Sequence, residues 1–178
     1  NTLIWDLDPQ GGAGFLLGQT PPEKPRMRDV FSRDLPPEKL IRETGIEGVD
    51  LLCADSSLSG LEHYLYALGK KRRLARLTEL MLKRYDRIIL DCPPVLNETA
   101  DQIIRAASIL IVPMTPSPVA MQGWVDVQGH LLRHHRKHGY VLPLFSMFDG
   151  RRKIHQQAQA AHPDWPIIPM SSIVEQMG

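Results

Sequence analysis

The stretch Thr2-Leu3-Ile4-Trp5-Asp6-Leu7-Asp8-Pro9-Gln10-Gly11 decides the fold that this sequence predicts. A mostly apolar run ends in two carboxylates and then opens into a glycine-rich segment that continues to Gly18. This pattern is typical of a buried parallel strand that leaves its sheet at the carboxyl end. Because ligands of open α/β sheets bind at that end, we expect Asp6 and Asp8 to lie at a binding site.

A second stretch, Arg87-Ile88-Ile89-Leu90-Asp91-Cys92-Pro93-Pro94, repeats this arrangement. It predicts a central strand that carries Asp91 at its tip, followed by a turn that the two prolines enforce. Acids at the tips of two strands indicate a site for a hard cation and the phosphates that it carries.

Strands and helices alternate along the rest of the chain. We expect further strands at residues 49–53, 108–113, 141–147 and 167–169, and the strand at 108–113 should be buried. Helices are expected at residues 61–68, 74–81, 97–107, 118–136 and 153–162, with Asn97 as the candidate cap of the third. The alternation predicts an α/β fold, a doubly wound and mostly parallel sheet with helices on both faces.

Length and composition bound the class of protein. The chain has 178 residues, 43% apolar residues and a net charge of +1, which predicts one domain over residues 1–178 and no strong global attraction to nucleic acid or membranes. The two cysteines form no disulfide framework, so a reducing cytoplasm is the natural compartment. Because Asn1 stands beside a core strand and Gly178 follows no closing element, we expect the domain to be incomplete at both ends.

Five stretches in this order resemble the ParA family of P-loop ATPases, which segregate plasmids and chromosomes. They are Asp8-Pro9-Gln10-Gly11, Leu90-Asp91-Cys92-Pro93-Pro94, Val112-Pro113-Met114-Thr115-Pro116-Ser117-Pro118, Phe145-Ser146-Met147-Phe148-Asp149-Gly150-Arg151 and Ile168-Pro169. The resemblance implies a P-loop NTPase-like fold, ATP and Mg²⁺ as ligands, and an ATP-dependent homodimer. It also implies non-specific DNA binding on the bacterial nucleoid and a ParB-like partner that stimulates hydrolysis.

The sequence departs from this family in one large feature. The family begins with a strand and a loop of the form Lys-Gly-Gly-x-Gly-Lys-Thr, and the glycines from Gly11 to Gly14 are not followed by a Lys-Ser or Lys-Thr pair. The backbone cradle, the phosphate lysine and the magnesium hydroxyl are therefore missing from these residues, and we expect the chain by itself to be inactive. A second departure is Met170, where the family often has arginine.

The resemblance assigns roles to particular residues. Asp91 matches the acid that holds Mg²⁺, generally through water, and Asp8 matches the acid that places the attacking water and contacts the metal. Gln10 and Gly11 would form the loop that responds to the γ-phosphate. Asp6, also at the nucleotide site, would support Asp8 from the strand, and the role of a simple turn or cap acid is equally open for it. Met147 and Pro169 occupy positions where related ATPases contact adenine, with ordinary core packing as the alternative.

Basic side chains are concentrated in the last third of the chain. By the resemblance they would contact DNA phosphates without sequence preference, and scattered surface charge is the open alternative. The candidates are Arg133, Arg136, Lys137, Arg151, Arg152 and Lys153.

Two other functions remain open at the level of sequence. A MinD-like ATPase that cycles on membranes would carry a C-terminal amphipathic helix, which these residues lack, so we expect no stable membrane association. A non-catalytic scaffold that keeps the fold is favoured by the missing phosphate loop and opposed by the intact Asp8 and Asp91.

Overall fold

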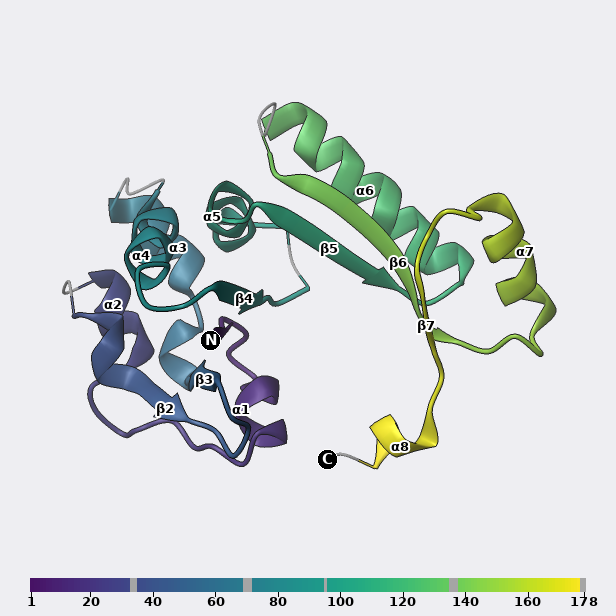
Figure 1. Cartoon of the computed structure of the whole chain (residues 1–178). Coiled ribbons are helices and arrows are strands. Elements are labelled where there is room, and N and C mark those ends of the chain that lie inside the picture. Colours follow the sequence, from purple (N-terminus) through teal and green to yellow (C-terminus); the bar gives the residue numbers. More distant parts are fainter. Residues whose placement is uncertain (33–34, 69–71, 95, 135–137, 177–178) are drawn as a thin grey trace. The chain divides into compact units, whose positions relative to one another are not determined.

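The computed structural model describes residues 1–32, 35–68, 72–94, 96–134 and 138–176 (Figure 1). The chain forms two compact units, Asn1–Ala106 and Ala107–Gly178, and each has its own sheet. None of the described helices is long and apolar enough to cross a lipid bilayer.

The first unit contains a four-stranded sheet with the order β2-β3-β1-β4. Its strands are β1 (Thr2–Asp6), β2 (Ile41–Glu43), β3 (Val49–Leu52) and β4 (Arg87–Asp91). Strand β1 pairs in parallel with both β3 and β4, whereas β2 pairs antiparallel with β3. The helices of this unit are α1 (Gly12–Leu16), α2 (Met27–Ser32), η1 (Pro37–Leu40), η2 (Ser56–Leu58), α3 (Leu61–Leu68), α4 (Arg73–Met81) and α5 (Glu98–Ala106).

A hydrophobic core fixes β1 within the first unit. Leu3 and Trp5 point into this core with no exposed surface, and Trp5 packs against Phe31 of α2 at a ring-centroid distance of 6.1 Å. Leu74 and Met81 of α4 join the same cluster. Burial of large apolar side chains contributes roughly 1.5–3 kcal/mol each, so the strand that ends in Asp6 is held firmly.

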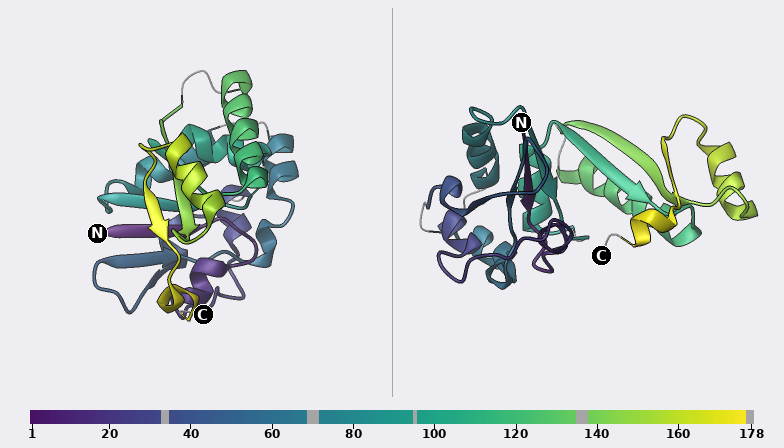
Figure 2. Two further views of the ribbon diagram at one scale, coloured as in Figure 1. Left: turned by 90° about the vertical axis from the view of Figure 1, so that its right-hand side faces the viewer. Right: turned by 60° about the horizontal axis from the view of Figure 1, so that its bottom comes forward.

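The second unit contains a three-stranded parallel sheet with the order β5-β6-β7. Its elements are β5 (Ile109–Met114), α6 (Pro118–His134), β6 (Tyr140–Phe148), α7 (Lys153–Ala161), β7 (Ile167–Pro169) and α8 (Ser172–Glu175). The long helix α6 runs along β5 and β6 in all the ribbon views (Figures 1 and 2). Trp165 packs edge-on to Trp124 of α6 and against Phe145 of β6, which joins helix and sheet.

The α/β prediction is confirmed, because parallel strands alternate with helices in both units. Asn97 caps α5 as expected, and its Oδ1 accepts the backbone N–H of Thr99 at 2.9 Å. The prediction of one domain over residues 1–178 stays a prediction.

Two expectations about strand positions are wrong. Strand β4 lies at the edge of its sheet rather than at the centre, since it pairs only with β1 among the described strands. Ile89 is accordingly 53% exposed. The strand expected at residues 108–113 is not buried either, because Ile109 and Ile111 of the edge strand β5 are exposed. The antiparallel strand β2 was not expected at all.

Candidate functional site

The carboxyl ends of β1 and β4 bring two acids together. Asp6 and Asp91 are direct partners in the parallel register of these strands, and the N–H of Leu7 donates to the carbonyl oxygen of Asp91 at 2.9 Å. Both strands point the same way, so both carboxylates lie at the same edge of the sheet. This is the edge at which ligands of open α/β sheets bind.

Asp6 is completely buried. Its Oδ1 accepts the backbone N–H of Asp8 at 3.0 Å, and its Oδ2 has no hydrogen-bond partner among the described residues. Burial raises the pKa of the Asp6 carboxyl, and the negative charge of Asp91 adds to this effect. A buried, half-satisfied carboxylate is costly, and a cation beside it would offset that cost.

Asp8 begins a tight loop that its own side chain stabilises. Its Oδ1 accepts the N–H of Gln10 at 3.0 Å, and its carbonyl oxygen accepts the N–H of Gly11 at 2.9 Å. Gly11 has a φ of +69°, a left-handed conformation that glycine adopts without strain. The loop then enters α1, since the N–H of Phe15 donates to the carbonyl oxygen of Gly11 at 3.0 Å.

The acids of this edge fit a hard cation. Asp6, Asp8 and Asp91 supply carboxylate oxygens, the ligand type that Mg²⁺ prefers. Among the described residues, no group of three or more His, Cys, Asp or Glu side chains could hold a metal ion by itself. Because Mg²⁺ usually keeps several waters and binds substrate phosphates, one or two of these carboxylates would suffice.

A cavity of about 440 Å³ lies beside this loop in the first unit. Three segments line it: the loop after β1, the stretch that leads to α2, and the residues that follow β3. The lining residues are Pro9, Gln10, Gly11, Gly14, Phe15, Gln19, Thr20, Pro21, Pro22, Glu23, Arg26, Ala54, Asp55 and Ser56. The sequence did not indicate this cavity, because it forms only where residues 9–26 meet the distant segment Ala54-Asp55-Ser56.

The two residues expected near adenine belong to the second unit. Met147 lies in an irregularity of the β6–β7 pairing and has a φ of +52°, which is unusual for a residue with a side chain. It is 54% exposed, so core packing does not explain its position. Pro169 is the register partner of Phe148, and the N–H of Met170 donates to the carbonyl oxygen of Phe148 at 2.9 Å. The fold therefore places Met147 and Pro169 close together.

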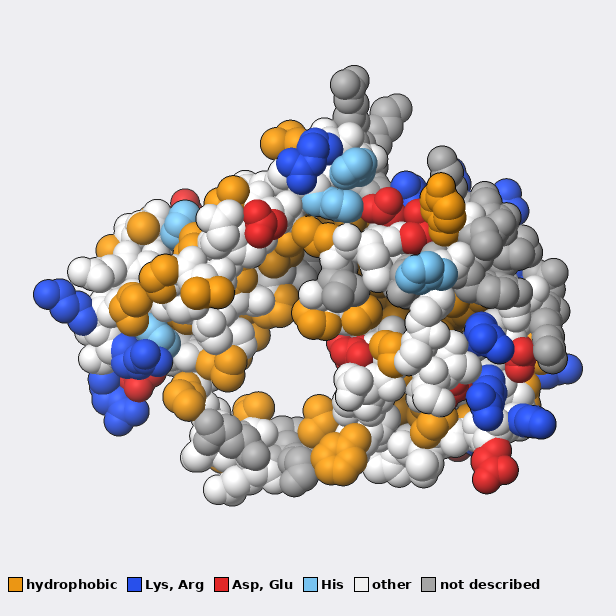
Figure 3. Space-filling view, turned by 180° about the vertical axis from the view of Figure 1, so that it is seen from behind, with side chains coloured by type: hydrophobic (Ala, Val, Ile, Leu, Met, Phe, Trp, Pro, Cys, Tyr) orange, Lys and Arg blue, Asp and Glu red, His pale blue; other side chains and the backbone are white. Residues whose placement is uncertain are grey.

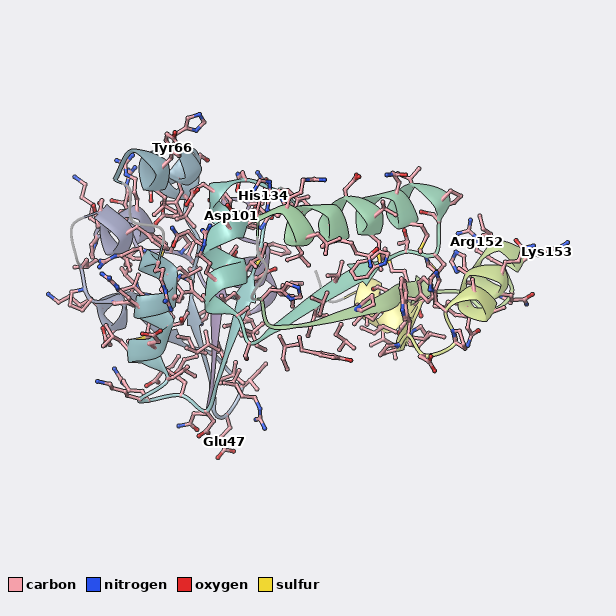
Figure 4. All side chains as sticks on the ribbon, turned by 90° about the horizontal axis from the view of Figure 1, so that it is seen from above. Glu47, Tyr66, Asp101, His134, Arg152 and Lys153 are labelled. Carbon is pink, nitrogen blue, oxygen red and sulfur yellow. The ribbon has the colours of Figure 1, made fainter. Side chains whose placement is uncertain are left out.

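The basic residues around α7 have different surroundings. Arg151 forms a two-pronged ion pair with Asp149, with Nε to Oδ1 at 2.9 Å and Nη2 to Oδ2 at 3.0 Å. This ion pair lowers the pKa of Asp149 to about 2. Arg152 and Lys153 are exposed and project from the start of α7 (Figure 4), and Lys and Arg side chains gather at this end of the second unit (Figure 3). Arg133 is exposed on the last turn of α6, and Arg136 and Lys137 lie outside the described residues.

His155 is a further residue of this region that the sequence did not single out. It is buried in α7, and its Nδ1 accepts the backbone N–H of Asp149 at 3.0 Å. Together with the tilted contact between the rings of Phe148 and His155, whose centroids are 5.6 Å apart, this bond fixes the turn that presents Arg151. An Asp-Gly-Arg turn before a histidine-bearing helix is the only signal that the sequence offered for it.

Comparison with known proteins identifies the family. Residues 1–137 match the family described as AAA domain. The chain is 30% identical over 158 residues to the sporulation initiation inhibitor protein Soj of Bacillus subtilis, covering 85% of this chain and 62% of that protein. It is 30% identical to the chromosome-partitioning ATPase Soj of Thermus thermophilus, covering 94% of this chain and 68% of that protein. The chain thus spans less than two thirds of the length of its Bacillus relative.

Solved structures agree on the fold. Cobyrinic acid a,c-diamide synthase from Mycobacterium smegmatis with bound ADP and magnesium superposes with a TM-score of 0.84 at 26% identity, covering 96% of this chain and 75% of that one. The McdA–ATP complex from Cyanothece gives a TM-score of 0.85 at 22% identity, covering 98% of this chain and 74% of that one. The family match and the Soj relatives together show that the chain belongs to the ParA family of ATPases.

Proposed function

We propose that the protein, as its gene encodes it, hydrolyses ATP with Mg²⁺ to partition plasmids or chromosomes in the bacterial cytoplasm. In this proposal it dimerises with ATP, binds nucleoid DNA without sequence preference, and responds to a ParB-like partner. The kinship with Soj proteins supports the role, and the adenine nucleotides bound in structures of the same fold support the ligand.

One observation carries the proposal: Asp6 and Asp91 are register partners at the carboxyl ends of two adjacent parallel strands, and Asp8, two residues further along, donates its backbone N–H to Asp6. Phosphoryl transfer to water depends on positioning and on neutralising charge, and bound Mg²⁺ supplies that neutralisation at the phosphates. In our account Asp91, which is exposed at the strand tip, holds the cation through water. Asp8 orients the attacking water, and its loop, with Gln10 and Gly11, responds to the γ-phosphate.

Asp6 has a supporting role in this account. Its buried carboxylate holds the N–H of Asp8 at 3.0 Å, so it fixes the direction in which the Asp8 side chain leaves the strand. Catalytic groups need support of this kind, because small displacements of a positioned group lower the rate strongly. Met147 and Pro169 contact the base in the same proposal, and the positive φ of Met147 is the observation in the second unit that favours a functional role.

The phosphate cradle is not among these residues. The sequence contains no glycine-rich loop that ends in Lys-Ser or Lys-Thr, and the chain covers 62% of its Bacillus relative. We therefore propose that the phosphate-binding loop belongs to a segment outside the 178 residues, whereas Asp6, Asp8 and Asp91 form the acidic part of the site within them.

DNA binding rests on the exposed basic side chains of the second unit. Arg152 and Lys153 have no ion-pair partner among the described residues, so their charges are available to phosphates. Arg151 is already paired with Asp149, which makes it the weaker candidate. Arg133 lies on α6, and Arg136 and Lys137 follow it in sequence. Two copies of such a surface in a dimer would double the phosphate contacts and make DNA affinity depend on ATP.

Equilibrium binding of labelled ATP to the full-length protein, with and without Mg²⁺, tests the proposal. We expect binding that Mg²⁺ strengthens, and we expect Asp91→Ala to remove that strengthening. Asp164→Ala, which replaces an exposed acid of the second unit, is the matched control and should bind like the wild type. A full-length protein that binds no ATP would instead favour a scaffold that keeps the fold without catalysis.

A further inference from the structure

The cavity beside the Asp8 loop shares only Gln10 and Gly11 with the residues to which the proposed hydrolysis assigns a role. Its volume of about 440 Å³ falls within the range of ordinary ligand sites. Its apolar lining residues include Pro9, Pro21, Pro22 and Phe15. Phe15 is 71% exposed, an unusual state for a large aromatic side chain and one that a bound partner would relieve.

The cavity is also lined by polar side chains. Within the described residues, none of them takes part in a hydrogen bond or ion pair through its side chain. These side chains are Gln10, Gln19, Thr20, Glu23, Arg26 and Ser56. Glu23 and Arg26 are of opposite sign and are both exposed, yet they form no ion pair with each other. The lining of the cavity therefore combines apolar residues, the two side-chain amides of Gln10 and Gln19, and two unpaired charges of opposite sign.

The walls are held in place by hydrogen bonds from the loop after β3. Asp55 accepts the N–H of Met27 through Oδ2 at 2.7 Å and the N–H of Ser57 through Oδ1 at 2.7 Å. Ser57 in turn accepts the N–H of Arg28 at 3.1 Å. These bonds fix the start of α2, and with it the stretch that carries Glu23 and Arg26. A preformed site of this kind lowers the entropic cost of binding.

We propose that this cavity binds an extended peptide segment of a partner protein, with an acidic residue for Arg26 and a basic residue for Glu23. An apolar residue of the same peptide would pack on Phe15 and the lining prolines. The amides of Gln10 and Gln19 both donate and accept, which matches the alternating N–H and C=O groups of an extended backbone. A phosphate-bearing ligand fits less well, because Glu23 and Asp55 place two negative charges against the one of Arg26.

A peptide bound in the cavity would restrict the loop that begins at Asp8. Pro9, Gln10 and Gly11 line the cavity and also follow Asp8 directly, so a bound peptide would restrict the loop that carries this acid. This consequence rests on the proposed ATPase function, whereas the binding itself does not. A binding measurement without nucleotide therefore separates the two claims.

The test selects peptides from a library of random dodecapeptides displayed on phage, with the full-length protein and no nucleotide. Selected peptides are synthesised with a fluorophore, and their affinity is measured by fluorescence anisotropy. We expect the double variant Glu23→Ala/Arg26→Ala to bind them at least ~10-fold more weakly, a loss typical of removing interface anchors. Phe15→Ala, which leaves all the charges in place, should also weaken binding.

The matched control is the double variant Glu47→Ala/Arg28→Ala, which removes the same charges from exposed positions outside the cavity. It should bind the peptides like the wild type, and thermal melting checks that every variant is folded. Selection of no peptide would overturn the proposal. Peptides that bind the wild type and the Glu23→Ala/Arg26→Ala variant equally would overturn it as well, since they would occupy another surface.

Discussion

Asp6 and Asp91 are register partners at the ends of the parallel strands β1 and β4, although 84 residues separate them in the chain. Asp6 is buried and has one oxygen without a partner, while Asp91 is exposed to an incoming ligand. Two acids of the same charge are not placed side by side for stability alone. Their juxtaposition is the structural reason to expect a cation at this edge of the sheet.

The 178-residue chain by itself should bind ATP poorly and hydrolyse none. The acids at the strand tips can accept a cation, but nothing in these residues surrounds the β- and γ-phosphates with backbone N–H groups and a lysine. Titration of the purified chain with labelled ATP checks this. Binding in the micromolar range would show that another segment of this chain supplies the cradle.

Asp55→Ala should destabilise the first unit. Each of its two oxygens accepts a backbone N–H at 2.7 Å, and alanine would leave both donors without this partner. We expect the free energy of unfolding to fall by about 1–3 kcal/mol, the range for losing a cap and leaving a partly buried donor unsatisfied. Urea denaturation measures it. Ser56→Ala, at the neighbouring exposed position, is the control and should change stability little.

The raised pKa of Tyr85 should make the free energy of unfolding depend on pH at high pH. Its hydroxyl donates to Oδ2 of Asp50 at 2.6 Å, and burial together with this bond raises the pKa of Tyr85 to about 12. The folded chain therefore keeps this proton where the unfolded chain loses it. The stabilisation is complete below pH 10, the ordinary value of the group, and is lost as pH rises toward 12.

Tyr85→Phe isolates this contribution. The variant should be less stable than the wild type at pH 8, and the difference should shrink between pH 10 and pH 12. Urea unfolding at several pH values measures both curves. A difference that stays constant over this range would show that the Tyr85 hydroxyl does not titrate with folding.

Arg152 and Lys153 should carry more of the DNA binding than Arg151 does. Each phosphate contact contributes about −0.9 to the slope of log affinity against log salt on duplex DNA. Arg152→Ala/Lys153→Ala in the full-length protein with ATP should therefore weaken binding to any sequence and flatten this slope. The control Lys83→Ala/Arg84→Ala removes two exposed charges from the first unit. Unchanged affinity and slope in the first variant would direct attention to Arg133 on α6.

Local sequence patterns predicted much of the fold and part of the site. Apolar runs ending in acids or prolines located β1 and β4, and helical periodicity located α4 and α5, because these signals lie within single elements. The same local signal located two acids of the candidate site: Asp91 is the last residue of β4, and Asp8 follows the end of β1 by two residues. The edge position of β4 could not be found, because strand order depends on pairing between distant segments.

The remaining features of the site depend on contacts that no single stretch encodes. The register that joins Asp6 to Asp91 pairs two distant strands, and the cavity forms where residues 9–26 meet residues 54–56. The pairing of Arg151 with Asp149 is local, yet a run of three basic residues looks the same whether or not its first member is already neutralised. The sequence therefore indicated a basic patch without showing which of its charges are available.

The most direct test of the central claim is single-turnover ATP hydrolysis by the full-length protein carrying Asp8→Ala. The substitution should leave ATP binding largely intact and lower the hydrolysis rate by at least ~10²-fold, as expected for the loss of a positioned catalytic group. Glu47→Gln, at an exposed turn of the first unit, should hydrolyse ATP at the wild-type rate. A wild-type rate in Asp8→Ala itself would contradict the account, because the carboxylate of Asp8 would then have no part in the reaction.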